Sequence, residues 1–164
     1  MRILLTTSCL ITTLASTTLA CAGDAWDATV RGTEARTPDQ ERTGFHLPPG
    51  FEIQLVASEP AIGKPLNLAF DAKGRLWVTT TREYPFPVKG DAKGRDNIVV
   101  LGDFGEDGHA RSTTVFADGL NIPIGLYPYK NGVIAHSIPD ISFFEDSDGD
   151  GKADKRTKDR KSVV

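Results

Sequence analysis

The chain has 164 residues and a formal net charge of −3, with 39% hydrophobic and 25% charged residues. This composition is typical of a soluble globular protein and excludes a collagen-like, coiled-coil or wholly disordered chain. The net charge is too small, and of the wrong sign, for a dedicated nucleic-acid-binding protein. The 16 glycines and 10 prolines divide the chain into many short elements, which favours strands and turns over long helices.

Residues 1–22 have the features of a secretory signal peptide. A basic N-terminus precedes an apolar, Thr-rich run, and small residues follow at Ala20, Cys21 and Ala22. The run is too short and too rich in Thr for a membrane span, so we expect cleavage after Ala20 or Ala22. The alternative is lipidation of Cys21, which would associate the protein with a membrane. The sequence predicts export to the periplasm or cell envelope.

Residues 23–44 form a zone of different composition. They are rich in Asp, Glu, Arg, Thr and Ala, and Trp26 and Val30 are their only large apolar residues. Such a segment buries too little surface to offset the entropy cost of ordering. We therefore predict a flexible linker that connects the signal peptide to the folded domain.

From Phe45 onward the pattern predicts strands. Residues 51–55 and 66–70 alternate between apolar and polar side chains, and 75–78 follow a turn at 71–74, which together indicate a hairpin. Three further short β-rich runs are bounded by Gly, Asp or Pro: 98–101, 133–135 and 141–144.

The sequence also repeats itself at two offsets. An offset of 43 places Ile98 on Ile141, Asp103 on Asp146, Asp107 on Asp150, Gly108 on Gly151, Ala110 on Ala153 and Thr114 on Thr157. An offset of 58 places Pro65 on Pro123, Leu66 on Ile124, Leu68 on Leu126, Gly74 on Gly132 and Leu76 on Ile134. The offsets differ because the first unit carries a longer loop around residues 82–96.

Repeating β units of roughly 40 to 50 residues are typical of propeller blades, which cannot bury both faces alone. The sequence therefore predicts an all-β fold over residues 45–158, a partial β-propeller of about two to three blades from a larger propeller of about six. Chance matching of Gly- and Asp-rich turns is the alternative explanation.

Several segments carry a family resemblance. The run 45–53, with 57–60, 68–71 and 74–79, resembles the opening of planctomycete-type membrane-bound dehydrogenases, and 118–123 and 146–151 continue the match. The resemblance implies a propeller of the glucose/sorbosone dehydrogenase type, in an oxidoreductase acting on a small molecule or carbohydrate. In such proteins a c-type haem domain often lies in a C-terminal region, and its Cys-x-x-Cys-His motif does not occur here. A quinone cofactor would suit the family, although no residue here supports one.

A second functional class stays open beside the oxidoreductase. A non-catalytic propeller could bind carbohydrate or protein, with calcium stiffening one of its loops. A Cys-x-x-Cys-His motif in the full-length protein would favour the oxidoreductase.

One loop offers oxygen ligands at the spacing of an EF-hand-like calcium loop. The candidate ligands are Asp146, Asp148, Asp150, Lys152 through its carbonyl, and Asp154. Gly151 permits the sharp turn, but Thr157 stands where the usual bidentate Glu would be. We predict Ca²⁺ at this loop, with an acidic solvated turn as the alternative. The repeated copy has Gly105 and Arg111 at two ligand positions, so we predict only a turn there.

Catalytic residues are not identified by the sequence. His46, His109 and His136 are isolated, with no nucleophile motif beside them. The better candidate for binding is the inserted loop with Arg82, Glu83, Tyr84 and Arg95, because long loops on rigid scaffolds often carry binding residues. A solvated loop without a ligand is the alternative.

The last six residues, 159–164, break the repeat, because charges stand where the 43-residue offset requires an apolar strand. They look like an in-frame reading of a sequencing adapter, and we expect them to be non-native. We also expect the chain to be the N-terminal piece of a longer protein and to be inactive alone.

Overall fold

A computed structural model describes residues 32, 34–90 and 92–161. The predicted signal peptide and the first part of the predicted linker lie outside these residues. The described residues from Arg36 onward belong to one compact unit.

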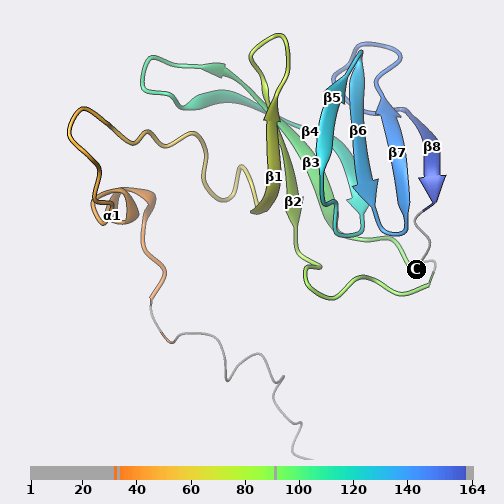
Figure 1. Cartoon of the computed structure of the whole chain (residues 1–164), viewed down its shortest axis with the longest axis horizontal. Helices are drawn as coiled ribbons and strands as arrows, with labels where there is room; N and C mark the ends of the chain where they lie inside the picture. The colour runs from red at the N-terminus through yellow and green to blue at the C-terminus, as the bar shows by residue number, and fades with distance from the viewer. Residues whose placement is uncertain (1–31, 33, 91, 162–164) are drawn as a thin grey trace, which may run out of the picture. The chain divides into compact units, whose positions relative to one another are not determined.

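The fold is all-β, as the sequence predicts, and consists of two four-stranded antiparallel sheets (Figure 1). Sheet A contains, in spatial order, β1 (Lys64–Phe70), β2 (Leu76–Thr81), β3 (Asp96–Phe104) and β4 (Ala110–Leu120). Sheet B contains β5 (Leu126–Tyr129), β6 (Gly132–Ser137), β7 (Asp140–Glu145) and β8 (Lys155–Lys161). Within each sheet, every strand pairs with the next one in the sequence, so both sheets are simple meanders.

A single-turn helix, α1 (Pro38–Arg42), lies in the segment that we expected to be a flexible linker. Thr37 caps it, because its hydroxyl accepts a hydrogen bond from the Gln40 amide while the Gln40 side chain accepts one from the Thr37 amide. This capping box, with Pro38 at the first helical position, stabilises the turn locally. The helix buries none of its residues, as expected for a segment so poor in apolar side chains.

The prediction of a strand at residues 51–55 is wrong. This segment lies outside both sheets, and just after it the Val56 carbonyl accepts a hydrogen bond from the Ala110 amide at 3.0 Å. Apolar residues from the following stretch, among them Val56, Ala57 and Ile62, pack instead on one side of sheet A. Alternation of apolar and polar residues therefore does not distinguish a segment that packs beside a sheet from a strand that pairs within it.

The main core lies between the two sheets. Side chains from β2, β3 and β4 of sheet A and from β6 and β7 of sheet B form one cluster: Trp77, Ile98, Val100, Phe116, Ala117, Leu120, Val133, Ala135 and Phe144. Trp77 and Phe116 form an edge-to-face pair with ring centroids 4.6 Å apart. The far side of sheet A carries a second cluster: Leu76, Val78, Val99 and Leu101. Sheet A is therefore packed on both faces.

The strand register supports the 43-residue repeat in detail. Val100 pairs with Thr114 in sheet A, and their counterparts Phe143 and Thr157 pair in sheet B. At the offset of 43, β3 thus corresponds to β7 and β4 to β8, and residues that pair in sheet A correspond to residues that pair in sheet B.

The 58-residue offset is correct for only part of its length. It relates Ala69 in β1 to Tyr127 in β5, but their partners Trp77 and Ile134 are 57 residues apart. The placement of Leu76 on Ile134 and of Gly74 on Gly132 is therefore wrong by one residue. The cause is the turn between the first two strands of each sheet, which is one residue shorter in sheet B.

Strand β8 continues through residues 159–161, the first half of the segment that we expected to break the repeat, and residues 162–164 lie outside the described residues. The backbones of Arg160 and Lys161 pair with those of Ile141 and Asp140 on β7. Nearer its start, the Lys155 ammonium lies 3.2 Å from a Glu145 carboxylate oxygen, and that of Lys158 lies 2.6 Å from the Asp140 carboxylate. Ladder hydrogen bonds use the backbone, so charged residues can occupy this strand while β7 supplies the opposite charge.

Asp71 fixes the hairpin between β1 and β2. One carboxylate oxygen accepts hydrogen bonds from the Lys73 and Arg75 amides, both at 2.9 Å. The other accepts from Arg75 Nε at 2.7 Å and Trp77 Nε1 at 2.9 Å. Burial alone would raise the pKa of Asp71, but the hydrogen bonds from Trp77 and Arg75 together hold that pKa below its usual value.

We predict that Asp71→Asn lowers the free energy of unfolding at pH 7 by about 1–3 kcal/mol, because an amide cannot accept at both positions. Since the pKa of Asp71 is lowered in the folded state, its contribution is present above the unfolded pKa of about 4 and is lost as the pH falls through the folded pKa. Urea unfolding at pH 7 and about pH 3 measures both effects.

The matched control is Asp118→Asn, which removes an exposed ion pair with Lys93 and should change the stability little. If Asp71→Asn lost as much stability on acidification as the wild type, other carboxylates would be responsible for the pH dependence.

Candidate functional site

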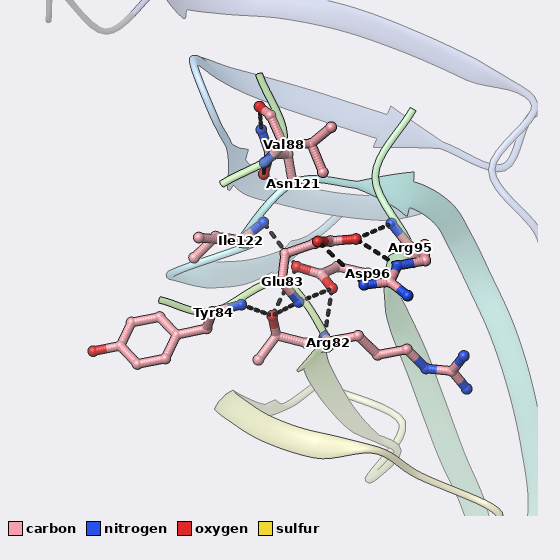
Figure 2. Close-up of polar contacts among 9 residues, drawn as sticks. Arg82, Glu83, Tyr84, Val88, Arg95, Asp96, Asn121 and Ile122 are labelled. Carbon is pink, nitrogen blue, oxygen red and sulfur yellow. Dashed lines mark hydrogen bonds and ion pairs between the residues drawn. The ribbon is translucent and has the colours of Figure 1, made fainter. Parts of the chain in front are cut away.

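The connection between β2 and β3 is a long loop, residues 82–95, whose counterpart in sheet B is the two-residue turn 138–139. Its base is fixed by Asp96, which is 1% exposed. One oxygen of the Asp96 carboxylate accepts hydrogen bonds from the Arg82 and Glu83 amides at 2.6 and 3.1 Å (Figure 2). The other accepts from Thr81 Oγ1 at 2.8 Å and from the Ile122 amide at 2.9 Å. One buried carboxylate therefore joins the loop to the segment that leads into sheet B.

Asn121 provides the second anchor. Its side-chain oxygen accepts from the Val88 amide and its side-chain nitrogen donates to the Val88 carbonyl, both at 3.0 Å (Figure 2). Its own backbone amide donates to Ser137 Oγ at 3.0 Å, and its carbonyl accepts from the Ile138 amide at 2.8 Å. The middle of the loop is thus tied to the β6–β7 turn of sheet B.

Two of the four loop residues predicted from the sequence form an ion pair. Arg95 Nε donates to a Glu83 carboxylate oxygen at 2.8 Å, and the Glu83 side chain is only 10% exposed. The hydrogen bond from Arg95 lowers the pKa of Glu83, and the same interaction raises the pKa of Arg95. Glu83 therefore stays ionised at neutral pH, which suits a structural or positioning role better than proton transfer.

The other two residues face solvent. Figure 2 shows the Arg82 guanidinium and the Tyr84 ring pointing away from Asp96. Tyr84 is 49% exposed, and Phe86 further along the loop is 62% exposed. Arg82 also lines an open cleft of about 480 Å³ with Glu59, Pro60, Ile62, Gly63, Lys64 and Thr81. The cleft therefore combines apolar surface from Pro60 and Ile62 with charged groups that can orient a small ligand.

The predicted calcium loop connects β7 to β8. Carboxylate oxygens of Asp146, Asp148 and Asp150 lie within 4.8 Å of one another. Asp146 accepts from the Gly149 and Gly151 amides at 2.6 and 3.0 Å, and both glycines have the positive φ that the tight turn requires. Three of the five predicted ligands are therefore brought together.

Asp154 is not part of this group. It accepts hydrogen bonds from the hydroxyl and amide of Ser147, at 2.6 and 3.1 Å, and these bonds lower its pKa. The Lys152 amide donates to Asp150 at 2.8 Å. In the repeated copy, Asp107 instead forms an ion pair with Arg111 at 2.8 Å.

The three histidines lie in different elements. His46 precedes β1, His109 lies in the β3–β4 turn with Nδ1 3.7 Å from the Asp107 carboxylate, and His136 lies in β6. Among the described residues, the helix present is too short and too polar to cross a membrane.

Residues 37–159 match the model of a family described as a domain of unknown function, DUF7133. The chain belongs to this family. No curated protein and no solved structure matches it. The DUF7133 match begins at Thr37, the N-cap of α1, and includes sheet A, the anchored loop, the Asp-rich loop and sheet B as far as residue 159 in β8.

Sequence reasoning found the long loop of this DUF7133 domain but missed its anchors. Asp96 and Asn121 bind mainly backbone amides and carbonyls, so their partners have no characteristic side chain. The one available signal was their position, Asp96 at the end of the inserted loop and Asn121 just before the repeated Pro123.

We predict that Asp96→Asn releases the base of the loop. Four groups now donate hydrogen bonds to the Asp96 carboxylate, two to each oxygen. In the Asn variant an NH₂ group, itself a donor, would face two of these four groups. Each buried group left unpaired in this way costs about 1–3 kcal/mol. Trypsin cleavage after Lys89 and Lys93 should accelerate, and urea unfolding should show lower stability.

The control is Asp103→Asn, the same change at an exposed position near the other end of β3. Equal cleavage rates for both variants would show that Asp96 does not hold the loop.

Proposed function

We propose that this DUF7133 chain is the N-terminal β-propeller portion of an exported oxidoreductase similar to the glucose/sorbosone dehydrogenase type. The observation that supports the propeller is the pair of four-stranded meanders, which repeat in register and pack face to face. The oxidoreductase activity, the planctomycete-type relatives and a periplasmic or cell-envelope location follow from the resemblance and the N-terminal segment of the sequence.

In this proposal the anchored loop contributes to substrate binding. Arg82 and Tyr84 both project from a base held by Asp96, and Arg82 lines the cleft that includes Lys64 and Glu59. A rigid loop loses little entropy when a ligand binds, which favours its use in recognition. The substrate would be a small molecule or carbohydrate, and a c-type haem in another region of the protein would accept the electrons.

A second candidate is a non-catalytic propeller that binds carbohydrate or protein. The exposed rings of Tyr84 and Phe86 on an anchored loop favour it, because aromatic faces pack on apolar faces of sugars and are enriched at protein interfaces. Turnover is what separates the two candidates.

We predict that the full-length protein reduces an artificial electron acceptor in the presence of a sugar or alcohol. Arg82→Ala and Tyr84→Ala should each lower kcat/KM by about tenfold or more, equivalent to about 1.4 kcal/mol, without lowering Tm. Lys89→Ala, on the same loop, is the control because its side chain is exposed beyond the anchored base.

The oxidoreductase proposal would be wrong if no sugar or alcohol were turned over. If the protein then also bound a sugar saturably, and Tyr84→Ala weakened that binding, the non-catalytic binding module would be the correct candidate. Turnover unaffected by both loop variants would move the substrate site elsewhere.

We also propose that the Asp146–Asp154 loop binds Ca²⁺. Three clustered carboxylates supply the charge and hard oxygen ligands that Ca²⁺ prefers, and the Lys152 carbonyl and Asp154 could complete the shell if Asp154 exchanged its bonds to Ser147. Bound calcium would relieve the repulsion among the carboxylates and stiffen the β7–β8 connection.

Calorimetry should therefore show Ca²⁺ uptake and a higher Tm with calcium, since a ligand that binds only the folded state stabilises it. Asp148→Ala and Asp150→Ala should each abolish uptake, whereas Asp107→Ala, at the repeat counterpart of Asp150, should not. Uptake that survives both loop variants would place the ion elsewhere.

A further inference from the structure

The face of sheet B that points away from sheet A is apolar and partly exposed. Val133, Ala135 and Phe144 point into the core between the sheets, so the alternate residues of β6 and β7 point outward. The same alternation places Tyr129 and Glu145 at one end of this outer face, and its apolar centre consists of Tyr127 beside Ile134, Ile134 paired with Phe143, and His136 paired with Ile141. Within this centre, Tyr127 is 65% exposed and the other four residues are half-buried.

The residues of the outer face correspond, in the repeat, to the residues of sheet A that pack against sheet B. Ile141 and Phe143 correspond to Ile98 and Val100 at the offset of 43, and Ile134 corresponds to Trp77 at the corrected offset of 57. In sheet A these positions are buried in the interface with sheet B. The outer face of sheet B is thus the apolar equivalent of the face of sheet A that packs on sheet B.

We propose that the outer face of sheet B binds a third four-stranded sheet of the same repeat, as sheet B itself packs on sheet A. The partner would present a small and apolar inner face like that formed by Val133, Ala135 and Phe144. This inference rests on the propeller part of the proposed function, and not on its oxidoreductase part.

A second copy of this chain fits the face less well than an additional repeat. The inner face of sheet B in a copy is already buried against that copy's own sheet A. The far side of sheet A is covered as well, by Val56, Ala57 and Ile62. Within the part of the chain that the structure describes, a copy therefore has no free surface equivalent to the one that sheet B offers to sheet A.

The test extends the full chain by one repeat. Because the offset of 43 places residue 161 on residue 118, replacing residues 162–164 by a copy of residues 119–161 continues the repeat in register. The copied segment carries His136→Gln, so that the original His136 on the outer face can be followed alone. Diethyl pyrocarbonate labelling, read by mass spectrometry, then reports whether His136 is covered.

We expect His136 to be labelled at least about tenfold more slowly in the extended chain than in the original one, because labelling then requires local opening of the interface. His46 and His109 lie outside the outer face and serve as internal controls, with unchanged rates.

A charged variant checks that the outer face is responsible. Phe143→Glu in the extended chain should restore rapid labelling of His136, because an unpaired carboxylate is costly to bury in the interface. The same substitution at Phe104, which is 37% exposed at the end of β3, should leave the protection intact. Phe143 points away from the core, so circular dichroism of the unextended Phe143→Glu chain should match that of the wild type.

Unchanged labelling of His136 in the extended chain would overturn the proposal. Protection in the unextended chain that rises with concentration, with a dimer in sedimentation, would assign the face to a second copy and would also overturn it. Neither result bears on turnover by the full-length protein, which tests the oxidoreductase separately.

Discussion

The structure depends on the burial of one face of sheet B against sheet A. A four-stranded sheet exposes two faces, and hydrophobic burial is the main favourable term in folding, so an isolated sheet with apolar residues on both faces is unstable. Trp77 and Phe116 pair edge to face in the cluster that joins the two sheets, and the Asp71 carboxylate accepts a hydrogen bond from the Trp77 indole nitrogen. This interface fixes the position of sheet B relative to sheet A, and the connections between the strands depend on that position.

Polar groups position the connections around that apolar interface. Asp96 at the base of the long loop has Pro139 as its counterpart in sheet B at the offset of 43, where the connection has only two residues. The anchor therefore occurs where there is a loop to hold. A buried carboxylate is stable only when hydrogen bonds satisfy it, and the four donors that converge on Asp96 compensate its desolvation.

Much of the fold could be predicted from the sequence because repetition and strand patterning are long-range signals. The offset of 43 was correct, since the β3–β4 and β7–β8 hairpins preserve both their lengths and their registers. The offset of 58 failed by one residue at β6 because a shortened turn shifts every following position, and glycine matching concealed the shift. The error at residues 51–55 had another cause, since alternation reports which side chains are buried and not how the backbone pairs. The composition of residues 23–44 did not predict helix α1, because a single turn depends on the local capping box of Thr37 and Gln40 and not on buried apolar surface.

The candidate loop shows where such prediction ends. An insertion in a repeat is visible as a change of offset, so Arg82, Glu83, Tyr84 and Arg95 could be selected together. Their division into an ion pair at the base and two exposed side chains depends on Asp96, whose partners at the loop are backbone amides. The exposed tips of Arg82 and Tyr84 can therefore change without loss of a buried contact. A loop built in this way can vary its exposed side chains while the two sheets that carry it remain the same.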